Sequence, residues 1–152
     1  MVTVLVLVGI IGAFSGFFLL TGLQGYLTSK QTSEGALQAQ TALERISKEL
    51  ADVTSLPVAP AANVSVTYTS SELPGQRSIS YDTNNKVISI TVDGTAYPLL
   101  TDVKSFLLAW DQADLNNDGT DEISGFTITF TAGEIGQPFA ARIYPRRFFT
   151  AP

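Results

Sequence analysis

The first charged side chain of this 152-residue chain is Lys30, and residues 1–29 contain no aspartate, glutamate, lysine or arginine. Residues 1–23 are almost wholly apolar and, as a helix, are long enough to span a membrane core of about 30 Å. Charged residues make up only 15% of the chain, whereas soluble domains average about 25%. This uneven distribution argues against a single soluble globule. The apolar segment starts without a basic region, so we expect that a leader has already been removed.

Glycine is frequent in and just after this apolar segment, at Gly9, Gly12, Gly16, Gly22 and Gly25. Glycine weakens a water-soluble helix, but it is common where helices pack closely in an apolar setting. The segment is either a lone membrane anchor or a helix that first spans the membrane and later packs against copies of itself. The spacing alone leaves both interpretations open.

Residues 30–56 have an amphipathic pattern. Apolar side chains recur at helical intervals: Leu37, Leu43, Ile46, Leu50 and Val53. Charged side chains are expected on the other helix faces: Glu34, Glu44, Arg45, Lys48, Glu49 and Asp52. Pro57 and Pro60 end the pattern. Because no proline lies within residues 1–56, we expect one continuous helix that is weakest at Gly22 and Gly25.

After Pro60 the apolar residues alternate with a period of two, which indicates strands. The pattern predicts six of them, over residues 64–68, 78–81, 87–92, 103–110, 126–131 and 139–144. A turn at residues 82–85, where asparagine tolerates a positive φ, joins two strands, and Asp93 and Gly94 form the next turn. We therefore predict an α+β fold: a hydrophobic helix over residues 1–29, an amphipathic helix over residues 30–56, and a β-rich domain over residues 57–152. The apolar stripe of residues 37–53 should cover one face of an antiparallel sheet.

The composition excludes several classes of function. The chain has no cysteine and no histidine, which excludes disulfides, thiol nucleophiles, Cys/His zinc sites and histidine-based catalysis. Carboxylates such as Asp111 and Asp114 form no catalytic pattern, and we expect no enzyme. The net charge of −5 disfavours general binding of nucleic acid. Arginines and aromatics near the C-terminus, such as Arg146 and Phe148, are better explained by an edge strand or a contact between subunits, so no specific nucleic-acid partner is predicted.

The most specific local motif is an acidic loop with Gly119 at its sixth position. Its candidate Ca²⁺ ligands are Asp114, Asn116, Asp118, the carbonyl of Thr120, and Glu122. Oxygen ligands at positions one, three and five match the start of a calcium loop. The twelfth position is Gly125, where an EF-hand has a bidentate glutamate, so we expect weak affinity, on the order of 10⁻⁴ M. The alternative is an acidic hairpin loop that binds no metal.

An uncharged apolar N-terminal segment, a proline-free helix that becomes amphipathic, and an antiparallel sheet, in this order, resemble a mature type IV pilin or pseudopilin. The pattern is closest to minor pilins and to type II secretion pseudopilins with a larger β domain. Residues 41–50 (TALERISKEL) are similar to the helix end of these proteins. Residues 99–106 (LLTDVKSF), the acidic loop and residues 126–130 (FTITF) are similar to parts of their sheet. Pseudopilins often bind calcium in a loop of the β domain, and the resemblance implies the same for the acidic loop.

The sequence departs from the family pattern at two positions. Leu5 stands where the family has a glutamate at the fifth mature position, and Gly22 stands near where many members have a helix-breaking proline. The family glutamate neutralises a neighbour's terminal amine and guides recruitment. Here no carboxylate precedes Glu34, so a buried Met1 ammonium should be neutral, or hydrogen-bonded to Thr3 of a neighbour. Family tip subunits also lack this glutamate, which favours a tip role.

The resemblance implies a structural subunit of a type IV pilus-like extracellular filament that polymerises through its N-terminal helix. The implied assembly residues are Met1, Leu5, Gly9, Gly12, Gly16 and Gly22. The implied partners are copies of the chain, an inner-membrane assembly machinery and a prepilin peptidase, and the N-terminus would be methylated. The chain would be inserted in the membrane before assembly and lie on the cell surface afterwards.

Two alternatives to the filament subunit stay open. One is a minor or tip pseudopilin of a type II secretion-like system, and the other is a monomeric membrane-anchored binding domain. Separately, Asn63 begins an Asn-Val-Ser sequence that is a glycosylation acceptor in a suitable host.

Overall fold

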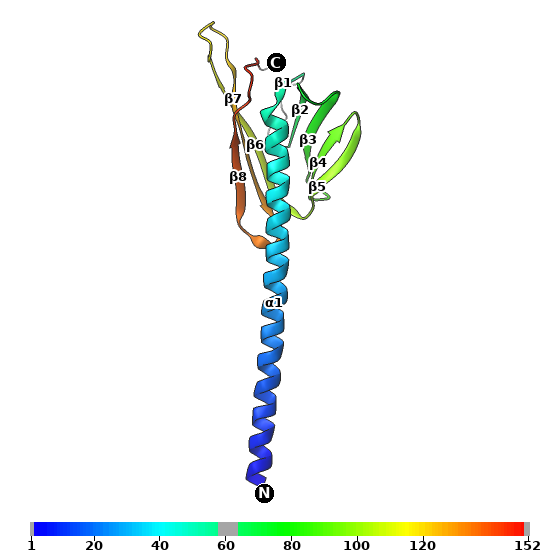
Figure 1. Cartoon of the computed structure of the whole chain (residues 1–152), viewed down its shortest axis with the longest axis vertical. Coiled ribbons are helices and arrows are strands. Elements are labelled where there is room, and N and C mark those ends of the chain that lie inside the picture. Colours follow the sequence, from blue (N-terminus) through cyan, green and yellow to red (C-terminus); the bar gives the residue numbers. More distant parts are fainter. Residues whose placement is uncertain (1, 58–63, 151–152) are drawn as a thin grey trace. The chain divides into compact units, whose positions relative to one another are not determined.

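The structure is a computed structural model that describes residues 2–57 and 64–150, with elements labelled in Figure 1. The predictions for Met1 and Asn63 lie outside the described residues. The chain divides into two compact units, residues 1–34 and residues 35–152, which we describe one at a time. The described elements confirm the predicted α+β class, with one long N-terminal helix followed by antiparallel strands.

Helix α1 (Val2–Ala51) is helical throughout, including the glycine-rich stretch where we expected its weakest point. In that stretch Thr21 Oγ1 donates a hydrogen bond to the Phe17 carbonyl, at 2.9 Å. The prediction that the helix extends to residue 56 is wrong by five residues. Strand β1 (Val53–Ser55) forms instead, because its residues pair with the end of a neighbouring strand. The Arg146 backbone amide donates to the Ala51 carbonyl at 2.9 Å and satisfies part of the last helical turn.

The described residues form eight strands in two antiparallel sheets. The strands after β1 are β2 (Ser65–Ser70), β3 (Gln76–Asp82), β4 (Val87–Val92), β5 (Thr95–Leu100), β6 (Val103–Ala113), β7 (Glu122–Ala132) and β8 (Pro138–Ile143). The first sheet has the order β1-β2-β3-β4-β5, and the second has the order β6-β7-β8. The six predicted strands are confirmed as β2, β3, β4, β6, β7 and β8, with shifted ends. Strand β5 was missed because Pro98 interrupts its pattern, and such a proline is tolerated at the edge of a sheet.

The turn between β3 and β4 is where the sequence predicted it, but its backbone differs in detail. Asp82 accepts hydrogen bonds from the Asn84 amide at 2.8 Å and the Asn85 amide at 3.0 Å. These bonds, together with one from the Asn85 side chain, hold the pKa of Asp82 below its usual value. The left-handed conformation falls on Lys86, at φ 55°, rather than on an asparagine. Asn84 and Asn85 thus donate hydrogen bonds to Asp82, and neither adopts the positive φ that was predicted for an asparagine.

The core of the second unit lies between the C-terminal part of α1 and the two sheets. Ala39, Ala42, Ile46 and Leu50 of α1 are buried in one hydrophobic cluster with side chains of both sheets. Leu37, which the sequence placed in this stripe, is 65% exposed. Leu37 precedes Leu43 by six residues, which corresponds to about 240° around the helix axis, so the two side chains lie on different faces of the helix. The small side chains of the two alanines occupy the buried face instead.

Candidate functional site

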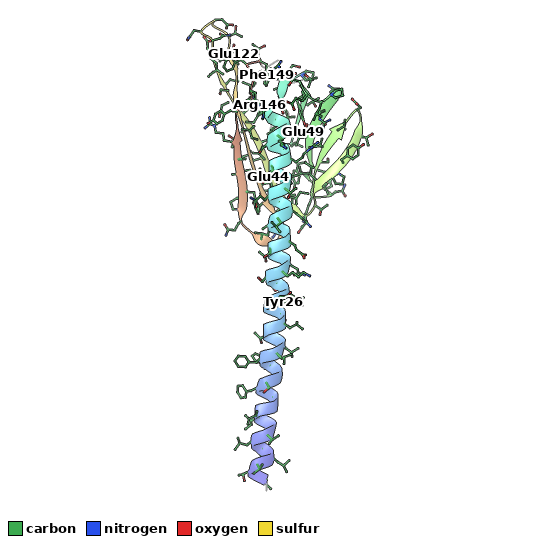
Figure 2. The ribbon with its side chains drawn as sticks, viewed as in Figure 1. Tyr26, Glu44, Glu49, Glu122, Arg146 and Phe149 are labelled. Atoms are coloured by element: carbon green, nitrogen blue, oxygen red, sulfur yellow. The ribbon has the colours of Figure 1, made fainter. Side chains whose placement is uncertain are left out.

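The apolar part of α1 is a candidate assembly surface. Each described residue from 2 to 34 is exposed, and Phe18 and Leu5 reach 77% and 73% exposure. Figure 2 shows side chains projecting from all sides of this part of the helix, around and below Tyr26. By length and composition it is the one described helix able to cross a membrane. An apolar surface of this extent requires a cover, which is either lipid or protein.

Residues of different size lie on opposite faces of this helix. At 100° per residue, Leu5, Gly9, Gly12 and Gly16 fall within about 60° of one another. The aromatic residues lie on the opposite side: Phe14, Phe17 and Phe18. Gly22 is about 110° from the centre of the glycine face and therefore does not extend it. Between Gly9 and Phe18 the helix thus has one shallow face and one bulky face.

No contact within the described residues explains these glycines. A Cβ added at Gly9, Gly12 or Gly16 would meet no described heavy atom within 4 Å. Each glycine in a helix costs about 1 kcal/mol relative to alanine. Close approach of a second helix is a physical reason to keep them, and the Gly12-to-Gly16 spacing is that of a close-packing motif.

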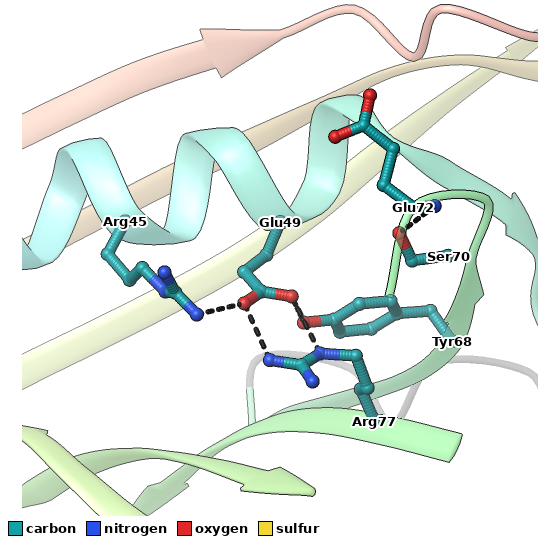
Figure 3. Close-up of polar contacts among 6 residues, drawn as sticks. All are labelled: Arg45, Glu49, Tyr68, Ser70, Glu72 and Arg77. Carbon is teal, nitrogen blue, oxygen red and sulfur yellow. Dashed lines mark hydrogen bonds and ion pairs between the residues drawn. The ribbon is translucent and has the colours of Figure 1, made fainter. Parts of the chain in front are cut away.

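A buried ionic network joins the end of α1 to the first sheet (Figure 3). Glu49 Oε1 accepts a hydrogen bond from Arg77 Nη2 at 2.7 Å and forms an ion pair with Arg45 Nη2 at 2.8 Å. Glu49 Oε2 accepts from Arg77 Nε at 2.8 Å and from the Tyr68 hydroxyl at 2.9 Å. The Glu49 side chain is only 1% exposed and that of Arg77 is 7% exposed. The network fixes the helix to β2 and β3.

The charge states in this network follow from burial and pairing. Burial, and then the Glu49 charge, raise the pKa of the Tyr68 phenol, so Tyr68 is a neutral donor. The hydrogen bond with Glu49 is the main cause that raises the pKa of Arg77. Two guanidinium groups therefore share one carboxylate, and the network carries one net positive charge.

Sequence reasoning missed this network because it assigned Glu49 to an exposed face. Two signals were present in the sequence. Glu49 follows Ile46 by three residues, so it continues the buried stripe, and Arg77 is two residues from the buried Ile79 in a strand. A charged residue at a buried position on each of two elements indicates an ion pair.

The loop between β6 and β7 brings the predicted calcium ligands together. The Asn116 side-chain amide donates to Asp118 Oδ2 at 2.9 Å and to Glu122 Oε1 at 2.8 Å. Both oxygens of Asp114 accept backbone amides of the loop, and Asp118 Oδ1 accepts the Thr120 amide at 2.8 Å. Gly119 has a φ of 86°, as the predicted sharp turn requires.

Hydrogen bonds within the loop occupy the carboxylate oxygens of Asp114, Asp118 and Glu122. The Asn116 hydrogen bond is the main cause that lowers the pKa of Asp118. Among the described residues, no three His, Cys, Asp or Glu side chains are grouped as a metal site. The donor chemistry suits Ca²⁺ only if Asn116 turns its oxygen toward the carboxylates, and the calcium site stays a prediction.

Millimolar Ca²⁺ is expected to raise the melting temperature of the full chain in detergent by about 5 °C. With a dissociation constant near 10⁻⁴ M, binding stabilises the folded state by about 1.4 kcal/mol. Thermal melts with Ca²⁺, with a chelator, and with Mg²⁺ as the matched control measure the effect. The Asp118→Ala variant should lose the increase. An equal melting temperature in all of these melts would mean that the loop is an acidic turn only.

Two of the C-terminal arginines, Arg142 and Arg146, make ion pairs within the chain. Arg142 pairs with Asp111 at 2.7 Å and lies over the Tyr144 ring, 5.5 Å from its centroid. Arg146 pairs with Asp52 at 2.9 Å. These pairs leave less free positive charge for phosphate contacts than the sequence alone indicated.

Comparisons of the chain with protein-family models, with curated proteins and with solved structures gave no match. The described architecture is consistent with a pilin-like arrangement, and the function is argued below from the surfaces of the chain.

Proposed function

We propose that the chain is a structural subunit of a type IV pilus-like extracellular filament that polymerises through α1. The observation that carries this proposal is the exposed apolar helix with a glycine face and an aromatic face on opposite sides. A membrane anchor needs only an apolar surface, because lipid adapts to any side chain. A helix that packs against other helices gains from small residues on its contact face.

The opposed faces favour an open assembly over a closed pair. A glycine face offers a groove, and phenylalanine side chains of another copy supply the bulk that fills it. Each copy then uses its glycine face toward one neighbour and its aromatic face toward the next. Such head-to-tail contacts generate rings or helical filaments, whereas a two-fold dimer joins identical faces. This arrangement supports a helical filament with the apolar helices in its core.

In this proposal the chain has two states, one before and one after filament assembly. The apolar part of α1 is compatible with insertion in a membrane, where lipid covers it before assembly. After assembly, copies of the same helix replace lipid, and the β domain, with its own core and its charged surface, lies outside. By resemblance to type IV pilins, the partners before assembly are an inner-membrane machinery and a prepilin peptidase.

The alternative of a minor or tip subunit is supported by one observation. Leu5 is exposed on the glycine face, at the position where the family has a glutamate. A tip subunit meets a neighbour on one side only and can dispense with the carboxylate that recruits it. The proposal of a principal subunit requires that Leu5 packs against the next helix in place of an ionic contact.

Electron microscopy of material sheared from cells that make this chain tests the proposal. Filaments in which this chain is the main component by mass spectrometry are the expected result. A trace amount at filament ends would support the tip subunit. Chain found only in membranes, with no filaments, would contradict the proposal and support a monomeric anchored domain.

A further inference from the structure

A groove runs between α1 and the edge strand β5, away from the surfaces discussed above. It consists of two adjoining hollows of about 530 and 340 Å³ that share Arg45 and Leu99. Leu37 and Thr41 line it from α1, and Tyr97 and Leu99 line it from β5. We call this hollow the α1–β5 groove. All of its lining residues belong to the second compact unit.

Much of the groove lining is apolar and accessible. Leu37 is 65% exposed and Tyr97 is 55% exposed, while Leu99 is half-buried and packs against the core. Leu37 was expected in the core, and its exposure adds an apolar side chain to the hollow that Leu99 also lines. Burial of these side chains by a partner would be favourable.

The groove lining is also cationic, since Arg45 lines both hollows and Arg77 lines the hollow that contains Tyr97. Arg45 and Arg77 share the single carboxylate of Glu49, which leaves one positive charge in excess. The Arg77 side chain is only 7% exposed, whereas that of Arg45 is 51% exposed, so Arg45 presents the more accessible guanidinium. A guanidinium at this point favours an anion.

The acidic loop between β6 and β7 (residues 114–121) has the complementary character. Three of its residues are both acidic and exposed: Asp114, Asp118 and Asp121. One apolar side chain, Leu115, is 40% exposed among them. A bound Ca²⁺ would still leave the loop with net negative charge. The loop therefore offers an apolar side chain flanked by carboxylates, which matches a groove lined by apolar side chains and arginines.

We propose that the acidic loop of a second copy docks in the α1–β5 groove. Leu115 would pack against Leu37 and Leu99, and the loop carboxylates would face Arg45 and Arg77. Figure 1 places the β6–β7 loop and strand β5 on different sheets and at opposite ends of the β domain, so a loop does not reach the groove of its own copy. The contact is head-to-tail and repeats along the filament. This inference rests on the proposed filament and names a contact between the outer domains.

Disulfide cross-linking tests the contact, because the chain has no cysteine of its own. The full chain carrying Leu37→Cys and Leu115→Cys is assembled and oxidised. We expect a ladder of covalent multimers, with a cross-linked fraction about tenfold above the control, since docking raises the local thiol concentration. The matched control combines Leu37→Cys with Leu107→Cys. Leu107 is 43% exposed and Leu115 is 40% exposed, but Leu107 lies on strand β6, outside the loop.

A pair of substitutions in the groove tests the charge argument and leaves the contact between Arg77 and Glu49 in place. Thr41 is exposed in the groove, so Thr41→Glu adds repulsion toward the acidic loop and Thr41→Lys adds attraction. In the cross-linking background, Thr41→Glu should lower the rate of ladder formation by roughly threefold, and Thr41→Lys should not lower it. Filaments that form normally but give no ladder, or a ladder that is insensitive to the charge at residue 41, would overturn this contact and leave the filament proposal standing. Absence of filaments from the unsubstituted chain would instead overturn the filament proposal itself.

Discussion

Replacing Arg77 with methionine is expected to lower the free energy of unfolding by about 3–5 kcal/mol. The substitution removes two of the three side-chain hydrogen bonds to Glu49 and leaves a carboxylate with a 1% exposed side chain. An uncompensated buried charge costs far more than the net gain from the ion pair. Urea denaturation of the full chain in detergent, followed by tryptophan fluorescence of Trp110, measures the change.

Arg45→Met is the matched control for this prediction. Arg45 contacts the same Glu49 oxygen at 2.8 Å, but its side chain is 51% exposed. Its loss should cost no more than about 1 kcal/mol, because water can replace it. A double variant, Glu49→Leu with Arg77→Met, should recover much of the stability lost in Arg77→Met. A cost near 1 kcal/mol for Arg77→Met would show that water reaches Glu49 and that the network is not sealed.

Gly12→Leu and Gly16→Leu are each expected to abolish filament formation while the chain stays in the membrane. The added side chain meets no described atom within its own chain, so folding of the subunit should not change. In the proposed filament it separates helices that must approach closely, at a cost of about 1–3 kcal/mol for each contact. Every subunit repeats this cost, so the association constant should fall by tenfold to more than a hundredfold. Sedimentation of sheared filaments, with membrane fractions measured in parallel, gives the result.

Gly25→Leu is the matched control for the glycine prediction. It adds the same volume in the same helix, but at about 170° from the glycine face, on the bulky side, where another apolar side chain fills no groove. Leucine is also the better helix former, so neither substitution weakens α1 itself. Normal filaments from Gly12→Leu and Gly16→Leu would rule out close packing at this face. Loss of filaments from all three variants would show that volume matters all around the helix.

The sequence predicted the α+β class because its strongest patterns are long. An apolar run that ends at Lys30 and a proline-free stretch over residues 1–56 leave few alternatives to a long helix. The errors came where tertiary pairing decided the outcome. Residues 53–55 were assigned to the helix, and they joined β2 because a strand end was available to them. Strand β5 could not be recognised from its own sequence, because Pro98 interrupts the alternation of apolar residues. Its pairing with β4 defines it as a strand.

The candidate sites were predictable to different degrees. The acidic loop and the glycine face are local in the sequence, and in the loop Asn116 contacts Asp118 and Glu122, while the calcium site stays a prediction. The Glu49 network was not predicted, because its members lie on three elements and only folding brings them together. The α1–β5 groove has the same origin, since it depends on Leu37 facing away from the core.

The placement of the Glu49 network has a mechanical consequence. The C-terminal part of α1 packs against both sheets through Ala42, Ile46 and Leu50, so a pull that reaches this part through the chain is passed to the β domain by these contacts. Sliding the helix then loads Ala42, Ile46 and Leu50 together, rather than one contact after another. The ionic network near the far end of the helix opposes the same displacement, because Arg77 is anchored in β3. A filament built from this chain would transmit tension through its core while the outer domains stay attached.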